Sequence, residues 1–141
     1  MQVENILQSK GRAVETVTSA TTIAQAVDVL NAKRIGAVVV VDAGKVVGIL
    51  SERDVVRHLG TDWAALADRP VSDIMTKNVF TASRFATISD VMERMTEKRI
   101  RHMPIVDNNE LGGIVSIGDV VKRKIEETEQ EALALKEYIA T

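Results

Sequence analysis

The stretch Gly48-Ile49-Leu50-Ser51-Glu52-Arg53-Asp54 has a counterpart later in the chain, Gly113-Ile114-Val115-Ser116-Ile117-Gly118-Asp119. In each string an apolar run typical of a strand ends at a serine, and a pattern typical of an apolar-faced helix begins directly after it. Both strings therefore mark a junction between a strand and a helix. A junction that occurs twice indicates two copies of one folding unit.

The similarity between the two copies extends well beyond these strings. Residues 14–57 align without a gap on residues 79–122, and fifteen of the forty-four aligned pairs are identical. The segments ahead of each copy also match, since Val3-Glu4-Asn5-Ile6-Leu7 resembles Val71-Ser72-Asp73-Ile74-Met75. Unrelated segments of this length share only a few residues. The sequence therefore predicts a tandem repeat.

The order of elements in the first copy is β-α-β-β-α. A short strand at Val14–Val17 precedes a helix whose apolar residues recur at i, i+3, i+4 and i+7, with Thr22 as the predicted N-cap. A buried strand at Ala37–Val41 follows, and a turn at Ala43-Gly44 leads into the returning strand Lys45–Leu50. The last helix begins near Ser51.

The second copy predicts the same order, with strands at His102–Val106 and Glu110–Val115 joined at Asn108-Asn109. The predicted fold class is α/β (α+β): two β-α-β-β-α repeats related by a pseudo-two-fold axis and packed sheet to sheet. The predicted boundaries are 1–68 for the first repeat with a lead-in helix and linker, 69–126 for the second repeat, and 127–141 for a helical extension. That extension carries an acidic surface and apolar residues. The sequence leaves open whether it faces a partner, a second copy or its own domain.

Composition excludes several classes of protein. The chain of 141 residues contains no cysteine, so a disulfide framework, a cysteine-ligated zinc site and a catalytic thiol are all ruled out. A net charge of −2 argues against nucleic-acid binding. No signal peptide and no apolar run long enough to span a membrane is present, and we expect a cytoplasmic protein. The two histidines do not predict a metal site.

The Ser-x-x-Asp strings have two interpretations. A helix N-terminus attracts anions, a serine hydroxyl can donate to a phosphate, and an ionised aspartate can accept from both hydroxyls of a ribose. The same spacing also fits a capping box, in which serine and aspartate only satisfy the first backbone amides of the helix. The two roles compete, because an aspartate turned back onto its cap is less available to a ribose. Their repetition at one offset favours a binding site.

The paired units and their Gly-apolar-x-Ser-x-x-Asp strings resemble tandem CBS (cystathionine-β-synthase) domains over nearly the whole chain, from Val3 to about Glu126. The resemblance implies that an adenosyl ligand such as AMP, ATP, S-adenosylmethionine or NAD(H) binds in clefts between the repeats. It assigns the ribose to Asp54 and Asp119, and the phosphate region to Ser51 and Ser116. It also implies a homodimer.

The resemblance further implies that each cleft takes residues from the opposite repeat. The Asp54 cleft would contain Arg53 together with Thr81, Ala82, Arg101, His102 and Met103. The Asp119 cleft would contain Thr16, Val17, Gly36, Ala37 and Val38. Arg101 and His102 make the first cleft the more basic one. We therefore expect the two sites to differ in affinity or in ligand, with AMP and NAD(H) the leading candidates and ATP next.

The predicted function is that of a regulatory module that senses energy or redox state and signals to a separate protein, which the sequence does not identify. Enzyme activity is not expected, since neither a Walker-type loop nor a Gly-x-Ser-x-Gly elbow is present, and no catalytic cofactor is implied. The alternative is a dimerisation scaffold that binds no ligand, in which the Ser-x-x-Asp strings serve as caps only.

Overall fold

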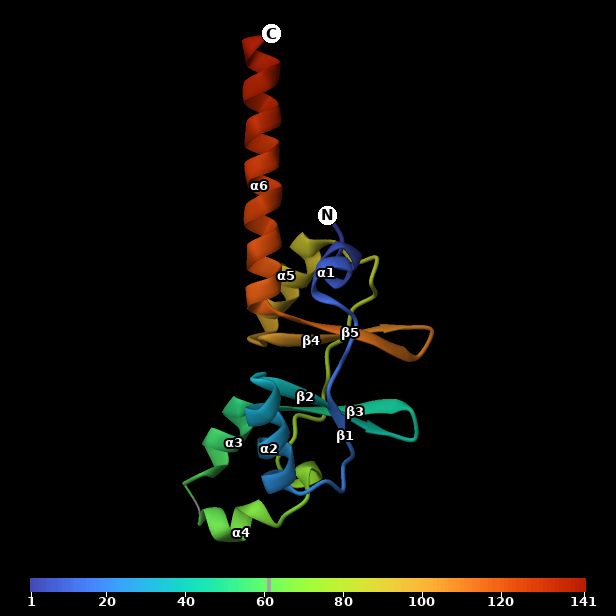
Figure 1. The fold of residues 1–141 in the computed structure, drawn as a ribbon, viewed down its shortest axis with the longest axis vertical. Coiled ribbons are helices and arrows are strands. Elements are labelled where there is room, and N and C mark those ends of the chain that lie inside the picture. Colours follow the sequence, from blue (N-terminus) through green and yellow to red (C-terminus); the bar gives the residue numbers. More distant parts are fainter. Residues whose placement is uncertain (61) are drawn as a thin grey trace. The chain divides into compact units, whose positions relative to one another are not determined.

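The computed structural model describes residues 1–60 and 62–141, and Figure 1 shows their helices and strands. Thr61, within the predicted first repeat, lies outside the described residues. The chain forms two compact units. Unit 1 contains Met1–Arg12, Thr81–Asp107 and Gly112–Thr141, and unit 2 contains Ala13–Phe80 and Asn108–Leu111.

Unit 2 is built on the first repeat and has the predicted β-α-β-β-α order. Its elements are β1 (Thr16–Val17), α2 (Ile23–Lys33), β2 (Ala37–Asp42), β3 (Lys45–Ser51) and α3 (Glu52–His58), followed by α4 (Trp63–Ala67) and the 3-10 turn η1 (Val71–Asp73). The strand order in the sheet is β1-β2-β3, with β1 parallel and β3 antiparallel to β2. The predicted N-cap of α2 is confirmed, because the Thr22 side chain accepts from the backbone N–H of Gln25.

The core of unit 2 lies between this sheet and its helices. Val38, Val40 and Leu50 of the sheet are fully buried, as are Ile23 and Ala26 of α2. The apolar residues of α2 thus follow the helical spacing that the sequence predicts, and the β2 run is buried on both faces because neighbouring elements cover it.

Both hairpins have the turns that the sequence predicts. Ala43 and Gly44 between β2 and β3 have φ angles of 50° and 77°, and Asn108 and Asn109 have φ angles of 51° and 63°. Two consecutive residues with positive φ form the type I′ turn whose twist matches that of paired strands. Asparagine and glycine adopt this conformation readily, whereas Ala43 adopts it at some cost.

Unit 1 is built on the second repeat. Its elements are α1 (Val3–Lys10), α5 (Ile88–Lys98), β4 (His102–Asp107), β5 (Glu110–Ser116, which belongs to this unit from Gly112 onward) and α6 (Ile117–Ala140), with β4 and β5 forming a two-stranded sheet. The first strand expected by analogy with the first copy is reduced to a single parallel bridge between Ala82 and Ile105. Figure 1 shows α1 and α5 beside this hairpin and α6 leading away from it.

The lead-in segments are exchanged between the repeats. Helix α1 precedes the first repeat in the chain but belongs to unit 1, where Leu7 is 1% exposed and packs against Gly113. In unit 2, Met75 packs in the same way against Gly48. A Cβ atom on either glycine would lie within 2.6 Å of the opposing side chain. A residue larger than glycine at either position would therefore force that side chain to move. The predicted boundaries, which follow chain order and place residues 1–12 with the first repeat, do not describe this exchange.

Helix α6 is continuous over 24 residues, from the strand junction at Ser116 to Ala140. No break separates the second repeat from the predicted extension at 127–141. Every residue from Thr128 onward is exposed within the structure described. Among residues 1–60 and 62–141, none of the helices has the length and apolar character needed to cross a bilayer.

Candidate functional site

The strand–helix junction of unit 2 is a complete capping box. Oδ2 of Asp54 accepts from the backbone N–H of Ser51 at 2.9 Å and from its hydroxyl at 3.1 Å. The backbone N–H of Asp54 donates in return to Ser51 Oγ at 3.3 Å. The capping interpretation of the Ser-x-x-Asp string is therefore confirmed in this copy.

Asp54 is also the one charged residue that is buried in the described part of the chain, with 8% of its surface exposed. Its second carboxylate oxygen, Oδ1, accepts from the hydroxyl of Thr76 at 3.3 Å. Thr76 is held in place because its backbone exchanges two hydrogen bonds with Ile49. His58 lies with Nδ1 2.7 Å from the backbone oxygen of Asp54, one turn along α3. Burial of a carboxylate is costly, and the hydrogen bonds that the Asp54 carboxylate accepts from Ser51 and Thr76 offset that cost.

The equivalent junction in unit 1 has the same cap and a different neighbour. Oδ2 of Asp119 accepts from the backbone N–H of Ser116 at 2.9 Å, and the Asp119 N–H donates to Ser116 Oγ at 3.2 Å. The ammonium group of Lys10 donates to the same Oδ2 at 2.7 Å and to the backbone oxygen of Ile114 at 3.0 Å. A cation therefore contacts the capping oxygen of Asp119, whereas a neutral hydroxyl contacts the other carboxylate oxygen of Asp54.

The Lys10 contact changes the acidity of Asp119. Burial by itself raises the pKa of the Asp119 carboxyl, but the hydrogen bonds from Lys10 and Ser116 and the charge of Lys10 outweigh it, and the pKa is lowered. A lowered pKa in the folded state favours folding above the unfolded pKa of about 4, and this contribution is lost as the pH falls through the folded pKa.

Replacing Lys10 with methionine is expected to raise the pKa of Asp119, since burial remains and the cation is gone. A carbon-13 NMR titration of the aspartate carboxyls measures this directly. Asp107 provides the internal control, because the Ser83 hydroxyl lowers its pKa independently of Lys10. The stability lost in the variant should be greatest above about pH 4 and fade at lower pH. An unchanged Asp119 pKa would show that Lys10 does not pair with it in solution.

Of the remaining predicted residues of the first repeat, Gly36 and Ala37 lie beside Ser51 within unit 2, whereas Thr16 and Val17 lie on the other side of β2. Ala37 pairs with Ser51 across the hairpin, Val38 pairs with Leu50, and the backbone oxygen of Gly36 accepts from the N–H of Glu52 at 2.9 Å. The β1 residues Thr16 and Val17 pair with Val39 and Val40 of β2. Arg53 is exposed on the first turn of α3.

The predicted residues of the second repeat are arranged in the same way within unit 1. The backbone oxygen of Arg101 accepts from the N–H of Ile117 at 2.8 Å, which brings Arg101 to the start of α6 beside Ser116. His102 is half-buried and Met103 is fully buried in β4. Ala82 bridges to Ile105 next to Thr81. Contacts between these residues and Asp54, and between the first-repeat residues and Asp119, stay predictions.

Two residues at the junctions were not predicted from the sequence. Thr76 and Lys10 both lie at the ends of the lead-in segments, and each contacts the aspartate of the repeat that the other lead-in precedes. The match between residues 3–7 and 71–75 indicates two lead-ins of the same kind, but it aligns Thr76 with Gln8 and Lys10 with Asn78 and so singles out neither residue. What the sequence does not reveal is that each segment packs on the opposite repeat.

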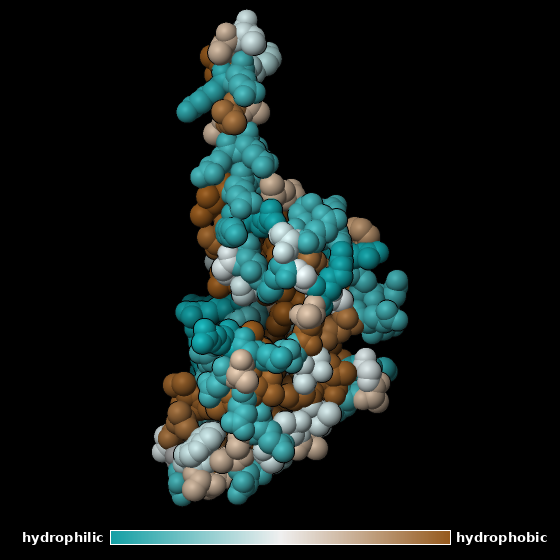
Figure 2. Space-filling view, viewed as in Figure 1, coloured by the Kyte–Doolittle hydropathy of each residue, from teal (hydrophilic) through white to brown (hydrophobic). Residues whose placement is uncertain are grey.

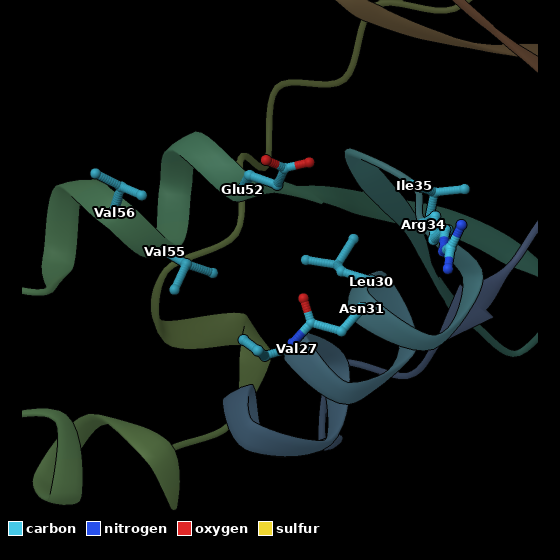
Figure 3. A pocket seen from close by; sticks show the side chains of 8 residues that line it. All are labelled: Val27, Leu30, Asn31, Arg34, Ile35, Glu52, Val55 and Val56. Atoms are coloured by element: carbon cyan, nitrogen blue, oxygen red, sulfur yellow. The ribbon is translucent and has the colours of Figure 1, made fainter.

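Two hollows of the surface include neither Asp54 nor Asp119 in their lining, although one of them includes Glu52, which directly follows Ser51. One of about 460 Å³ in unit 2 lies between α2 and α3 and is lined mainly by apolar side chains, with Leu30, Ile35 and Val55 among them (Figure 3). Another of about 460 Å³ in unit 1 includes Thr81 and Ala82 but also three acidic residues, Asp90, Glu93 and Glu97. The lining also contains Arg94, so three acidic groups stand against one cation, a balance that disfavours a phosphate. Among the described residues, no group of three or more histidine, aspartate or glutamate side chains is arranged to hold a metal ion.

Comparison with known proteins identifies both repeats. The model of the CBS domain matches residues 6–61 and 71–126. The CBS domain-containing protein CBSX3, mitochondrial, of Arabidopsis thaliana is 32% identical over 97% of this chain and 71% of its own length. The crystal structure of the CBS-domain protein ATU1752 of Agrobacterium tumefaciens superimposes with a TM-score of 0.84 at 46% identity, covering 88% of this chain and 99% of that one.

Two solved structures of similar proteins contain adenosine derivatives. The CBS domain protein PAE2072 of Pyrobaculum aerophilum, in complex with AMP, is 26% identical with a TM-score of 0.74 and covers 84% of this chain and 89% of its own. The CBS domain pair of protein MJ0100, in complex with 5′-methylthioadenosine and S-adenosyl-L-methionine, is 27% identical with a TM-score of 0.79 and covers 90% and 98%. This chain belongs to the CBS domain family, a regulatory and non-catalytic family, and carries two CBS domains in tandem.

Proposed function

We propose that this CBS pair is a sensor that binds an adenosine-containing ligand through Asp54 and Asp119. The observation that supports the proposal is that capping uses only one of the two oxygens of each carboxylate. In both copies the capping box uses Oδ2, so capping does not consume Oδ1. The competition between the two roles is thereby relieved, and one aspartate can serve both.

The chemistry of the remaining oxygen suits a ribose. An ionised carboxylate oxygen accepts hydrogen bonds and donates none, and the 2′- and 3′-hydroxyls of a ribose both donate. At Asp54 the contact to be displaced is the Thr76 hydroxyl at 3.3 Å, a long hydrogen bond between side chains. The structural relatives that contain AMP, or 5′-methylthioadenosine and S-adenosylmethionine, support an adenosine-based ligand. AMP and NAD(H) are the first candidates, and ATP is the next.

The two positions are proposed to differ in affinity. The Lys10 ammonium contacts Oδ2 of Asp119 and neutralises the carboxylate, so Oδ1 of Asp119 carries less negative charge with which to attract a ribose hydroxyl. No cation makes such a contact with Asp54 among the described residues. We therefore assign the tighter site to Asp54 and the weaker one to Asp119. The output is regulatory: ligand binding changes the conformation or the assembly of a homodimer, and this change is passed to a partner protein.

The alternative is a scaffold whose Ser-x-x-Asp strings serve as caps only. One observation favours it, namely that both strings form complete capping boxes without any ligand. Under this alternative no nucleotide stabilises the protein, and the aspartates contribute about 0.5–2 kcal/mol each as caps.

Thermal unfolding with AMP, ATP, NADH and S-adenosylmethionine, added one at a time, separates the two functions. A ligand present at about 100 times its dissociation constant should add about 2.7 kcal/mol, which corresponds to a shift of several degrees for a chain of this size. Mass spectrometry of the denatured protein first establishes that no ligand was carried through purification. The absence of a shift with every nucleotide, in protein shown to be ligand-free, would favour the scaffold.

A further inference from the structure

Helix α6 carries an uncovered apolar stripe. Val121, Ile125, Leu135 and Ile139 are 40%, 53%, 60% and 74% exposed. Together with the exposed residues Thr128 and Ala132 they recur at alternating intervals of four and three residues, the 3.5-residue spacing of a coiled coil. Figure 2 shows hydrophobic residues, in brown, at several heights along this helix.

This stripe is not the face by which α6 closes unit 1. The inward face is marked by Val120, which is fully buried, and by Glu127, which pairs with the N-terminal amine of Met1 at 3.4 Å. Lys124 on that side donates to Ser89 Oγ at 3.0 Å. Successive residues are turned by about 100° around a helix, which places the stripe roughly a quarter turn from the inward face. One face of α6 therefore completes the unit, and the stripe is partly covered at Val121 and increasingly exposed towards Ile139.

The polar member of the stripe is already satisfied. The hydroxyl of Thr128 donates to the backbone oxygen of Lys124 at 2.9 Å, within the helix itself. Covering the stripe would leave no unpaired hydroxyl at this position. Ile125 and Ile139 stand at a positions of the heptad and Leu135 at a d position, the combination that favours two parallel strands, while Ala132 fills the third a position and Val121 and Thr128 the other d positions.

The charges beside the stripe distinguish between the possible orientations of a partner helix. Lys122, Glu129 and Lys136 follow one flank, and Lys124 and Glu131 follow the other. In a parallel pair of identical helices, Lys124 meets Glu129 of the second copy and Glu131 meets Lys136 of the second copy. In an antiparallel pair, Glu129 meets Glu129, Glu131 meets Glu131, and Lys122 meets Lys136. The parallel arrangement has only attractive pairs at these positions, whereas the antiparallel one has repulsive pairs.

We propose that the stripe on α6 pairs with α6 of a second copy of this chain in a parallel two-stranded coiled coil. The partner is a second copy because the stripe and its flanking charges are complementary to themselves. Glu129, Glu131 and Lys136 have no ion-pair partner among the described residues, so they are available for these contacts. Lys124 is partly engaged by Ser89, which makes Glu131 with Lys136 the more informative pair.

Single-cysteine variants of the whole chain test the orientation, since the natural sequence has no cysteine. In a parallel coiled coil Ile139 lies directly opposite Ile139 of the second copy, and Ile139→Cys is expected to form a disulfide-linked dimer within minutes of mild oxidation. Gln130→Cys lies on the outer face of the helix and should remain monomeric on a non-reducing gel. Equal cross-linking of both variants, or none in either, would overturn the proposal. An antiparallel pair would place Ile139 opposite Val121 and would also leave Ile139→Cys unlinked.

A charge exchange tests the flanking pair without touching the stripe. Glu131→Lys is expected to raise the dimer dissociation constant about tenfold, measured by sedimentation equilibrium, because like charges then face each other. The double variant Glu131→Lys, Lys136→Glu should restore it. Circular dichroism checks that α6 remains helical, so a loss of helix cannot be mistaken for a loss of pairing. Dimerisation that is the same for the wild type and both variants would contradict the proposed pairing. These measurements need no nucleotide, and their outcome is independent of the ligand proposal.

Discussion

Asp54→Ala is expected to abolish the tighter adenosine-ligand site. A hydrogen bond to a charged group contributes about 1.5–3 kcal/mol, so the loss of two ribose contacts should weaken binding about a hundredfold or more. Half of the capping box is lost as well, because the backbone N–H of Ser51 loses its acceptor while Ser51 Oγ keeps its bond to the N–H of residue 54, and the free energy of unfolding should fall by about 0.5–2 kcal/mol. Isothermal titration calorimetry with AMP measures the binding, and denaturant unfolding measures the stability.

The matched control for this variant is Asp119→Ala, which removes the same cap from the other repeat. We expect it to destabilise the protein to a similar extent while leaving the tighter binding event in place, because the Lys10 ammonium already neutralises the Asp119 carboxylate. If Asp54→Ala binds AMP as the wild type does, the ribose assignment is wrong. If both variants lose binding equally, the proposed difference between the two positions is wrong.

Leu7→Ala is expected to cause the largest loss of stability among simple substitutions of the lead-in helix. Leu7 is 1% exposed and fills the space that Gly113 leaves open. Truncation of a buried leucine to alanine costs about 2–5 kcal/mol, a large part of the 5–15 kcal/mol by which a typical domain is stable. The exposed neighbour Gln8→Ala should change stability by no more than about 0.5 kcal/mol.

The elements that exchange hydrogen faster in Leu7→Ala show which repeat α1 packs against, and so test the exchange of the lead-in segments. Because α1 belongs to unit 1, hydrogen exchange in Leu7→Ala should accelerate first in β4, β5 and α5, which come from the second repeat. Faster exchange confined to α2, β2 and β3 would instead place α1 with the repeat that follows it in the chain. That result would agree with the predicted boundary of 1–68 for the first repeat.

Local features of the fold were predictable because they depend on residues close together in the chain. The Ala43-Gly44 and Asn108-Asn109 turns, the Thr22 cap and the Ser51 and Ser116 junctions are each specified by a few neighbouring residues, and all are confirmed. The tandem repeat was equally accessible, because its evidence is identity at a fixed offset. The predicted AMP or NAD(H) preference stays a prediction.

The features that sequence reasoning missed depend on contacts between distant segments. Lys10 and Asp119 are separated by 109 positions, and Thr76 and Asp54 by 22. Nothing in the local pattern around Lys10 distinguishes it from other exposed lysines at helix ends. The first strand of the second copy also proved shorter than the repeat predicts, since only Ala82 forms a bridge where β1 pairs over two residues. Tertiary packing determines how many residues of each first strand pair with the next strand. The identity between the two copies does not determine this number.

The central claim is that an aspartate carboxylate holds the ribose of the ligand. A double-mutant cycle between Asp54→Ala and the ligand 2′-deoxy-AMP measures that contact directly, with binding followed by calorimetry. The account predicts that removing the 2′-hydroxyl weakens binding to the wild type about tenfold or more and has little further effect on Asp54→Ala. Equal losses in the wild type and the variant would contradict it, because they would show that the hydroxyl and the carboxylate act independently.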